Sequence, residues 1–234
     1  MTSGKKILLS GVKPTGRPHI GNYFGAMGPN VELSMQDEYD GFVMIADYHA
    51  LTGTQDARVM REWIVDLAID YLAIGLDPRK VVLFQQSSVS AHTEAAWIFN
   101  CITSLSYLMR AHAFKDAEVK NKNINVGTFD YPMLMAADIL LYNADVVPVG
   151  NDQKQHVELT RDIAAKFNHD YGVDFFPMTE PVIEGPAMRV MNLRDGSKKM
   201  SKSTPPSISH TGVSASACRY AAASTSIPLV CRWN

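Results

Sequence analysis

The sequence predicts an α/β fold, in which an open, doubly wound parallel sheet is covered by helices on both faces. Short apolar runs typical of buried strands alternate with amphipathic segments of helical period. A loop rich in glycine and proline joins the first of these runs to the start of a helix. Of the 234 residues, 46% are hydrophobic and 20% are charged, near the averages for globular proteins, which argues against a disordered or fibrous chain.

Four apolar runs are the predicted strands, and four segments of helical period follow them. The strands are residues 6–10, 41–47, 81–85 and 146–149. The helices are residues 55–74, 93–102, 132–142 and 152–167. The first of these helices is the most regular, and Gly75 is expected to end it. In an open parallel sheet, ligands bind beyond the carboxyl ends of the strands, so we expect the loops that follow the strands to share one site.

Residues 204–234 differ from the rest of the chain. They contain no Lys, Asp or Glu and show no apolar period. We therefore expect one domain over residues 1–203, followed by an irregular tail that is disordered or a misread C-terminus.

The charge and the cysteine content of the sequence indicate which partners and which cellular compartment to expect. The formal net charge is −2, so any contact with a nucleic acid has to come from a local basic patch. Cys101, Cys218 and Cys231 are odd in number and lack the spacing of metal ligands. No apolar run is long enough to cross a membrane or to act as an export signal. We expect a cytoplasmic protein without a membrane partner.

The loop Pro14-Thr15-Gly16-Arg17-Pro18-His19-Ile20-Gly21-Asn22 lies between the first strand and a helix. Free backbone N–H groups and the positive end of a helix suit a phosphate group there. Gly21 has no side chain to keep a nucleotide away. A histidine that begins a helix is more often a cap or a surface residue, so this loop alone is a weak indication.

A second candidate loop, the basic segment Lys199-Met200-Ser201-Lys202-Ser203, lies toward the C-terminal end of the sequence. By itself it is as consistent with a solvated surface loop as with a binding site. Together, the two loops resemble the paired signatures of the class I aminoacyl-tRNA synthetases, whose catalytic domain is Rossmann-like. The resemblance extends from about Lys6 to Ser203.

This resemblance implies that ATP activates the carboxylate of an amino acid. An α-carboxyl group has a pKa of about 3.5, so it is already ionised at neutral pH and needs no general base. Donors aimed at the phosphates would lower the barrier electrostatically. Mg²⁺ would arrive with ATP, without a dedicated protein site. The implied catalytic residues are His19, Asn22, Lys199 and Lys202. The implied ATP-binding residues are Lys13, Pro14, Thr15, Gly21, Asn22, Gly150, Asn151, Asp152, Val190, Lys199, Met200, Ser201, Lys202 and Ser203.

Tyr131, Met135 and Asp138 share one face of the helix that is predicted to begin at Pro132. An acidic side chain among apolar residues is costly to bury without a donor. Asp138 therefore either has a partner within the protein, which is the more common case, or receives a ligand. The residues alone leave both possibilities open.

The same helix, with Asp152-Gln153-Lys154-Gln155-His156 after it, resembles the tryptophanyl branch of the family. The resemblance implies that Asp138 accepts the indole N–H, that Tyr131 and Gln153 hold the amino group, and that Met135 lines the indole pocket. An acceptor-only carboxylate is the right complement for indole, which offers one donor. The tyrosyl branch is the nearest rival, but it usually has glutamine at the position of Met135.

The resemblance implies L-tryptophan and tRNA(Trp) as partners and a homodimer. It also implies a helical anticodon-binding domain after Ser203, where this sequence instead changes character. We therefore expect a chain truncated after the second loop, with adenylate formation possible and tRNA charging weak or lost. Two other hypotheses remain. One is a small nucleotidyltransferase that acts on a non-amino-acid acid or a phosphate, and the other is a non-catalytic fragment that binds a partner or is an incomplete gene product.

Overall fold

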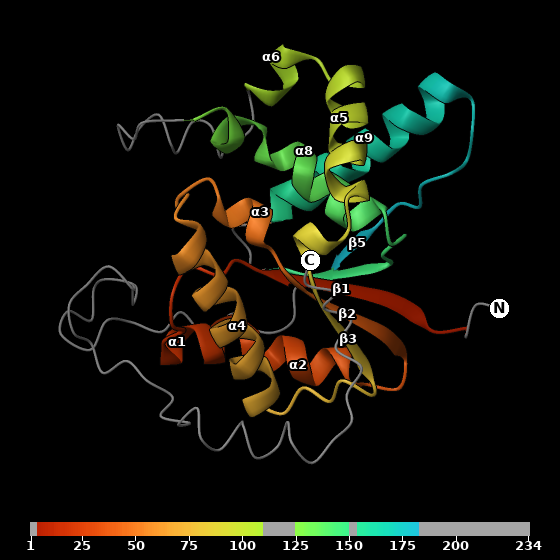
Figure 1. Ribbon diagram of the computed structural model, residues 1–234. Helices are drawn as coiled ribbons and strands as arrows, with labels where there is room; N and C mark the ends of the chain where they lie inside the picture. The colour runs from red at the N-terminus through yellow and green to blue at the C-terminus, as the bar shows by residue number, and fades with distance from the viewer. Residues whose placement is uncertain (1–3, 110–124, 150–153, 183–234) are drawn as a thin grey trace, which may run out of the picture.

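The computed structural model describes residues 4–109, 125–149 and 154–182. Five parallel strands form one sheet in the order β3-β2-β1-β4-β5 (Figure 1). They are β1 (Lys6–Val12), β2 (Tyr39–Ile45), β3 (Val81–Gln85), β4 (Val146–Pro148) and β5 (Glu180–Val182). The sheet grows outward from β1 in both directions, so the strand order reverses between β1 and β4. This is the doubly wound arrangement that the alternating pattern predicted.

Helices cover both faces of the sheet (Figure 1). On one face lie α2 and α4, and on the other α5, α8 and α9. The helical segments are α1 (Ile20–Asn22), the π-helical η1 (Tyr23–Met27), α2 (Gly28–Ser34), α3 (Asp47–Ala50), α4 (Ala57–Ala73), the 3₁₀ turn η2 (Gln86–Ser88), α5 (Ala91–Ile102), α6 (Leu105–Leu108), α8 (Val126–Leu140) and α9 (Lys154–Tyr171). Within the described ranges, no helix combines the length and apolar character needed to span a membrane.

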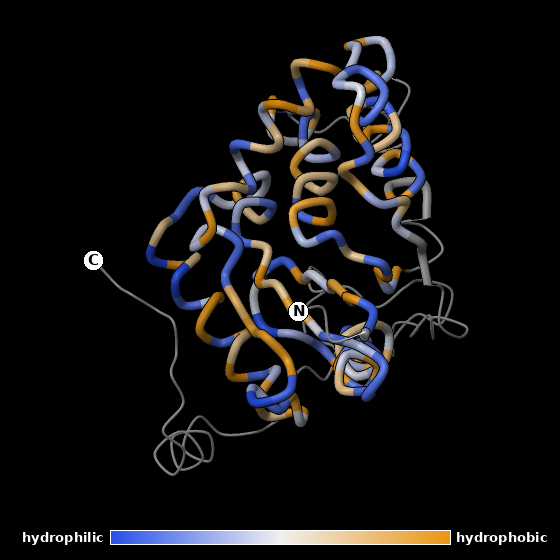
Figure 2. The backbone as a smooth tube through the Cα atoms, turned by 90° about the vertical axis from the view of Figure 1, so that its right-hand side faces the viewer, coloured by the Kyte–Doolittle hydropathy of each residue, from blue (hydrophilic) through white to orange (hydrophobic). Residues whose placement is uncertain are grey.

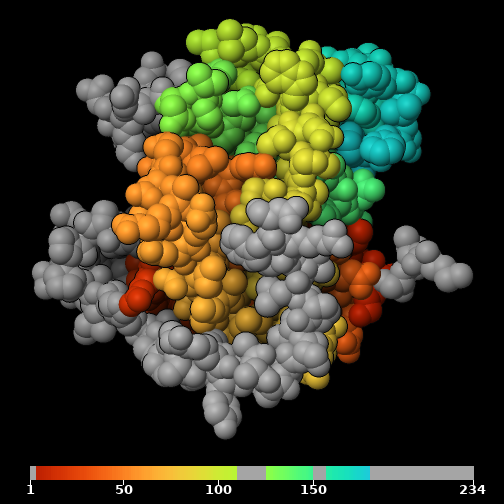
Figure 3. All heavy atoms as spheres, viewed as in Figure 1, coloured from red at the N-terminus to blue at the C-terminus, as the bar shows by residue number. Residues whose placement is uncertain are grey.

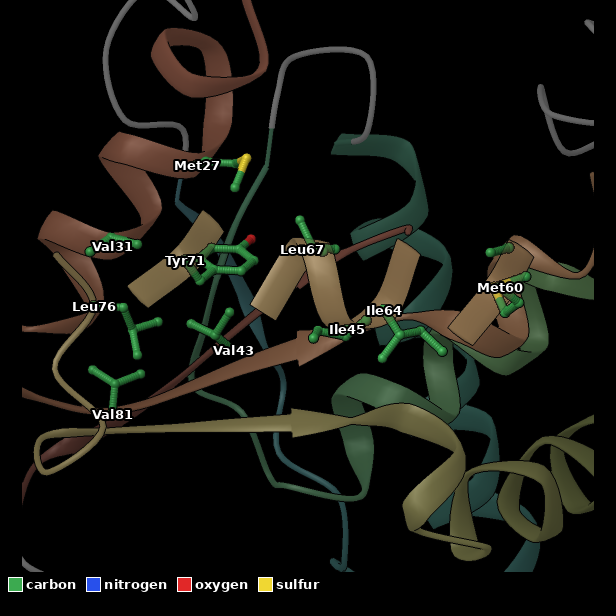
Figure 4. Packing of buried hydrophobic residues seen from close by; sticks show 11 residues of the cluster. Met27, Val31, Val43, Ile45, Met60, Ile64, Leu67, Tyr71, Leu76 and Val81 are labelled. Carbon is green, nitrogen blue, oxygen red and sulfur yellow. The ribbon is translucent and has the colours of Figure 1, made fainter. Parts of the chain in front are cut away.

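The core on the first face lies between α4 and the sheet. Figure 4 shows Ile64, Leu67 and Tyr71 of α4 directed toward Val43 and Ile45 of β2. These α4 residues recur every three or four positions, so they form the single apolar stripe that the sequence predicted. Tyr71 is fully buried, and burial raises the pKa of its phenol. The helix then ends as expected, because Gly75 adopts φ +105°, a conformation that favours glycine.

The opposite face of the sheet packs against α8. Leu9 of β1 and Met44 of β2 contact Ile139 of α8 in one hydrophobic cluster. Beyond it, α5, α8 and α9 pack on one another around Phe99 and Met133. In Figure 2, hydrophobic and hydrophilic residues alternate along the outer helices, as expected for elements with one buried face. Helix α8 is therefore enclosed on both sides, which explains why most of its second half is buried.

The predicted start of α8 was wrong. The helix begins at Val126 instead of Pro132, and the side chain of Asn125 caps it by accepting a hydrogen bond from the Thr128 N–H at 2.8 Å. Asparagine is among the best N-cap residues, so this cap fixes the boundary. Pro132 lies inside the helix and is buried there. Strand β5 was not predicted, because three residues that include a glutamate and a proline show no apolar run.

Gly41 allows α2 to pack closely on the sheet. A Cβ atom at this position would overlap with the backbone carbonyl oxygen of Ser34, at the end of α2. Gly41→Ala is expected to lower the free energy of unfolding by about 2–3 kcal/mol, because backbone has to move to admit the methyl group. Gly53→Ala is the matched control, since its nearest neighbour lies 3.9 Å away. Thermal denaturation measures both, and equal midpoints would contradict the expectation.

Candidate active site

The candidate site lies where the parallel strands end. The carboxyl ends of β1, β2 and β3 lie side by side, because Val12 pairs with Ile45 and Ile45 pairs with Gln85. The loop with His19 follows β1, α3 follows β2, and Gln86 follows β3 directly. The segments that follow these three strands therefore begin at one edge of the sheet, where the sequence predicted a shared site.

His19 and Asn22 hold each other at the start of α1. The Nδ1 atom of His19 accepts a hydrogen bond from the Asn22 N–H at 3.1 Å, and Oδ1 of Asn22 accepts one from the His19 N–H at 3.0 Å. This reciprocal arrangement is a capping box. Since Nδ1 is an acceptor, neutral His19 carries its proton on Nε2. Gly21 lies within the same turn. The two predicted catalytic residues in the described part of the chain are thus brought together.

The loop after β1 also reaches the helix that was predicted to hold the amino acid. Lys13 follows β1, and its Nζ lies 5.2 Å from the centre of the Tyr131 ring, in a cation–π contact. Pro14 is buried beside it, whereas Thr15 is exposed. The predicted nucleotide loop and the predicted amino-acid face, more than a hundred positions apart in the sequence, therefore lie next to each other.

Asp138 is buried, with 2% of its surface exposed, and has three partners within the protein. Its Oδ1 accepts hydrogen bonds from Nε2 of Gln86 and Nδ1 of His92, each at 2.7 Å. Its Oδ2 lies 2.7 Å from Nε2 of His49. Of the two possibilities that the residues left open, the internal partner is confirmed. It does not exclude the other, because an ionised carboxylate has about four acceptor positions.

The charge of Asp138 is maintained by its neighbours. Burial alone raises the pKa of this carboxyl, but hydrogen bonds from His49 and His92 and their Coulombic attraction outweigh burial and hold the pKa below its usual value. Asp138 is therefore an ionised acceptor at neutral pH. Both positions on Oδ1 are used by Gln86 and His92, whereas Oδ2 contacts only His49 among the described residues and has one acceptor position left.

The sequence predicted no site role for His49, Gln86 or His92. Gln86 is fully buried, and its Oε1 accepts a hydrogen bond from the Tyr48 N–H at 3.0 Å, which turns its amide NH₂ toward Asp138. The position of Gln86 could have indicated its role, because it follows β3 directly at the carboxyl edge. No pattern in the sequence pairs His92 with Asp138.

Tyr131 and Met135 lie on α8 within two turns of Asp138, and both are half-buried. The Tyr131 ring meets the His49 ring edge to face, with centroids 6.1 Å apart. Met135 packs with Phe84 and Tyr142 against the sheet. The three residues therefore lie close together on α8, as their spacing predicted, and they present a phenol, a thioether and a carboxylate.

The remaining predicted residues lie outside the described part of the chain. They are Gly150, Asn151, Asp152, Gln153, Val190, Lys199, Met200, Ser201, Lys202 and Ser203. The expectation for residues 204–234 lies outside it as well.

Two other features bear on the site. Among residues 4–109, 125–149 and 154–182, no group of three or more His, Cys, Asp or Glu side chains is arranged to hold a metal ion. A cavity of about 430 Å³ lies between the C-terminal end of α5 and α9, lined by Cys101, Ser104 and Lys166 among others. It lies at the opposite end of α5 from His92, so it is separate from the candidate site.

The strand order and the loops that converge at the carboxyl edge place this chain in the class of doubly wound, Rossmann-like α/β proteins. The model of the family described as tRNA synthetases class I (W and Y) matches residues 1–217, and the chain belongs to this family. The match continues past Ser203, where the sequence resemblance was expected to stop.

Individual relatives lie in the tryptophan branch. The chain is 51% identical over 205 residues to the tryptophan--tRNA ligase of Caulobacter vibrioides and 53% identical over 195 residues to that of Fusobacterium nucleatum. These matches cover 87% and 83% of this chain and 59% of each relative. The structure of tryptophanyl-tRNA synthetase from Campylobacter jejuni, complexed with ADP and tryptophan, superimposes with a TM-score of 0.77 at 42% identity. That superposition covers 84% of this chain and 60% of the other. The chain thus spans about 60% of the length of these relatives.

Proposed function

We propose that this chain activates L-tryptophan with ATP, which forms tryptophanyl-adenylate and pyrophosphate, for transfer to tRNA(Trp). The observation that carries the proposal is the buried, ionised Asp138 with one acceptor position left on Oδ2, at the carboxyl edge of the sheet. Indole offers one N–H donor and no acceptor, so it is the matching ligand group. The tryptophan bound in the Campylobacter jejuni relative supports this assignment.

The reaction needs little chemistry from the protein. An oxygen of the tryptophan carboxylate attacks the α-phosphorus of ATP, the bond from this phosphorus to the bridging oxygen breaks, and pyrophosphate leaves with the electron pair. Negative charge grows on the α-phosphate and on the leaving group. Nε2–H of His19 suits a phosphate oxygen, because the cap already uses Nδ1 as an acceptor. We assign His19 and Asn22, with Lys199 and Lys202 of the second loop, to this role.

The remaining ligand contacts follow the sequence assignments. Lys13, Pro14, Thr15 and Gly21 would approach ATP from the loop after β1. Tyr131, with Gln153, would hold the amino group of tryptophan. The further ATP contacts are proposed at Gly150, Asn151, Asp152, Val190, Met200, Ser201 and Ser203. Mg²⁺ would be bound by the phosphates of ATP.

Tyrosine is the competing amino acid. A phenol oxygen both donates and accepts, so its pocket should provide a donor as well as an acceptor. Met135 offers a thioether there, which donates no hydrogen bond. The face of α8 therefore favours indole over phenol, although both rings would reach Asp138.

The proposal is tested by tryptophan-dependent exchange of labelled pyrophosphate into ATP, beside reactions with tyrosine and without an amino acid. We expect exchange with tryptophan alone. Exchange with tyrosine alone would overturn the specificity, and exchange with neither would favour an inactive or partial fragment. The chain spans about 60% of the length of its relatives, so adenylate formation and transfer to tRNA have to be tested separately. A charging reaction with tRNA(Trp) measures the transfer.

A homodimer and a cytoplasmic location complete the proposal. Trp97 and Ile98 of α5 are 70% and 43% exposed, and Leu105 of α6 is 63% exposed, so the outer side of these helices offers apolar area to a second copy. Figure 3 shows α5, in yellow, at the molecular surface. Sedimentation velocity of the purified chain would measure its mass in solution. The cytoplasmic location follows from a role in supplying charged tRNA.

A further inference from the structure

His92 is fully buried at the start of α5 and contacts Asp138 on one side and Tyr142 on the other. Its Nδ1 lies 2.7 Å from Oδ1 of Asp138, and its Nε2 lies 3.0 Å from the Tyr142 hydroxyl. It is therefore the middle member of a chain of three polar groups. The tryptophan assignment gives His92 no role, because no ligand would touch it.

The two neighbours determine which nitrogen of His92 carries the proton. Burial, together with the charge of Asp138, raises the pKa of Tyr142 to about 12. The phenol therefore stays protonated, and its O–H can donate a hydrogen bond. The carboxylate of Asp138 can only accept. Nδ1–H of His92 donates to Asp138 whether or not the ring carries a charge, and in the neutral ring Nε2 accepts from Tyr142.

Packing holds the imidazole in this orientation. The ring of Phe84 stacks on the His92 ring, with an interplanar angle of 21° and centroids 6.3 Å apart. The Tyr142 ring lies against both, with centroids 5.4 Å from Phe84 and 5.6 Å from His92. The donor to Asp138 is therefore fixed by aromatic neighbours as well as by hydrogen bonds.

We propose that His92, oriented by Tyr142, is a positioning residue for tryptophan selection. By donating Nδ1–H to Oδ1 of Asp138, it holds the carboxylate so that the remaining acceptor position on Oδ2 faces the ligand. This inference rests on the proposed role of Asp138 in binding indole. Gln86 occupies the other position on Oδ1 and His49 one position on Oδ2, so a rotated carboxylate would break three contacts at once.

The inference predicts a change in pH dependence when His92 is replaced. Among the described residues, the titratable groups that face Asp138 are His49 on α3, His92 on α5 and Tyr142 in the turn after α8. Hydrogen bonds from the two histidines oppose the effect of burial on the Asp138 carboxyl. Without the donor from His92, the pKa of Asp138 rises, so the carboxylate is protonated at a higher pH and tryptophan affinity is lost earlier on acidification.

The test uses three variants of the 234-residue chain. His92→Leu removes both contacts at similar volume. His92→Asn keeps a donor to Asp138, because the amide nitrogen of asparagine, like Nδ1, is two bonds from Cβ. Tyr142→Phe removes only the hydroxyl. His169→Leu, at an exposed histidine of α9, is the matched control.

Tryptophan and ATP affinities are measured by calorimetry from pH 5 to 8, and the Asp138 pKa by NMR titration of its carboxyl carbon without ligand. We expect His92→Leu to weaken tryptophan binding roughly tenfold at neutral pH, with a larger loss at acidic pH and ATP affinity unchanged. His92→Asn should recover most of the affinity, and Tyr142→Phe should lie between. The Asp138 pKa should rise in His92→Leu and stay unchanged in His169→Leu.

An unchanged Asp138 pKa in His92→Leu overturns the inference, whether or not the chain binds tryptophan. A raised pKa with unchanged tryptophan affinity overturns it as well, and so does an equal loss of ATP affinity that His92→Asn does not recover. Failure of the proposed function looks different, since tryptophan would then bind neither the unaltered chain nor any variant while the Asp138 pKa still responds to His92.

Discussion

Replacing Asp138 with alanine is expected to abolish the preference for tryptophan and to leave ATP binding largely intact. The change removes the acceptor for indole, and loss of a hydrogen bond to a charged group weakens binding by roughly 10- to 100-fold. It also leaves donors of His49, Gln86 and His92 without an acceptor in a buried site. We expect the free energy of unfolding to fall by about 3 kcal/mol for this reason. Exchange kinetics with tryptophan and with tyrosine measure the preference, and denaturant unfolding measures stability.

Asp138→Asn separates these two effects. The amide keeps one oxygen for Gln86 and His92, and His49 can adapt by exchanging its tautomer, so stability should fall less than in the alanine variant. The amide NH₂ at the position of Oδ2 would then face the indole N–H, donor against donor. Tryptophan binding should therefore be lost while the fold persists. Unchanged selectivity in both variants would show that Asp138 does not select the amino acid.

The stability that Asp138 contributes should also depend on pH. Its pKa in the folded state lies below the usual value, so its contribution is present at neutral pH and is lost as the pH falls through the folded-state pKa. Unfolding of the unaltered chain and of Asp138→Asn should therefore converge at acidic pH. A constant difference between the two across this range would contradict the shift.

His19→Ala is expected to slow pyrophosphate exchange by about 100- to 1,000-fold, because a donor aimed at the developing phosphate charge is lost. The same change removes a helix cap, which is worth about 1 kcal/mol of stability. His19→Asn is the matched variant, since asparagine is a good cap but lacks Nε2–H. If the cap alone matters, His19→Asn should react at the rate of the unaltered chain. If Nε2–H matters, both variants should be slow and only His19→Ala destabilised.

Much of the fold could be predicted from local pattern. The sequence gives clear signals for β1, β3 and α4, because the residues that each element buries follow the period of a strand or a helix. The predictions were weakest where the bounds or the existence of an element depend on contacts with another segment of the chain. Strand β5 exists because β4 pairs with it, and Pro132 lies within α8 because Asn125 caps the helix earlier.

The candidate site divides in the same way. The loop after β1 and the face of α8 could be predicted because their residues lie close together in the sequence and their side-chain types indicate the chemistry. The pairing of Asp138 with His49, Gln86 and His92 joins residues 46 to 89 positions apart, and no local rule relates them.

The sequence by itself determined the doubly wound fold, the loop after β1 and the shared face of Tyr131, Met135 and Asp138 on α8, because strand and helix periods and loop chemistry are local properties. The tertiary structure decided the state of Asp138. Only the meeting of α3, η2, α5 and α8 at one edge of the sheet gives a buried carboxylate enough donors to remain charged, and among the described residues the same contacts leave one acceptor position on Oδ2.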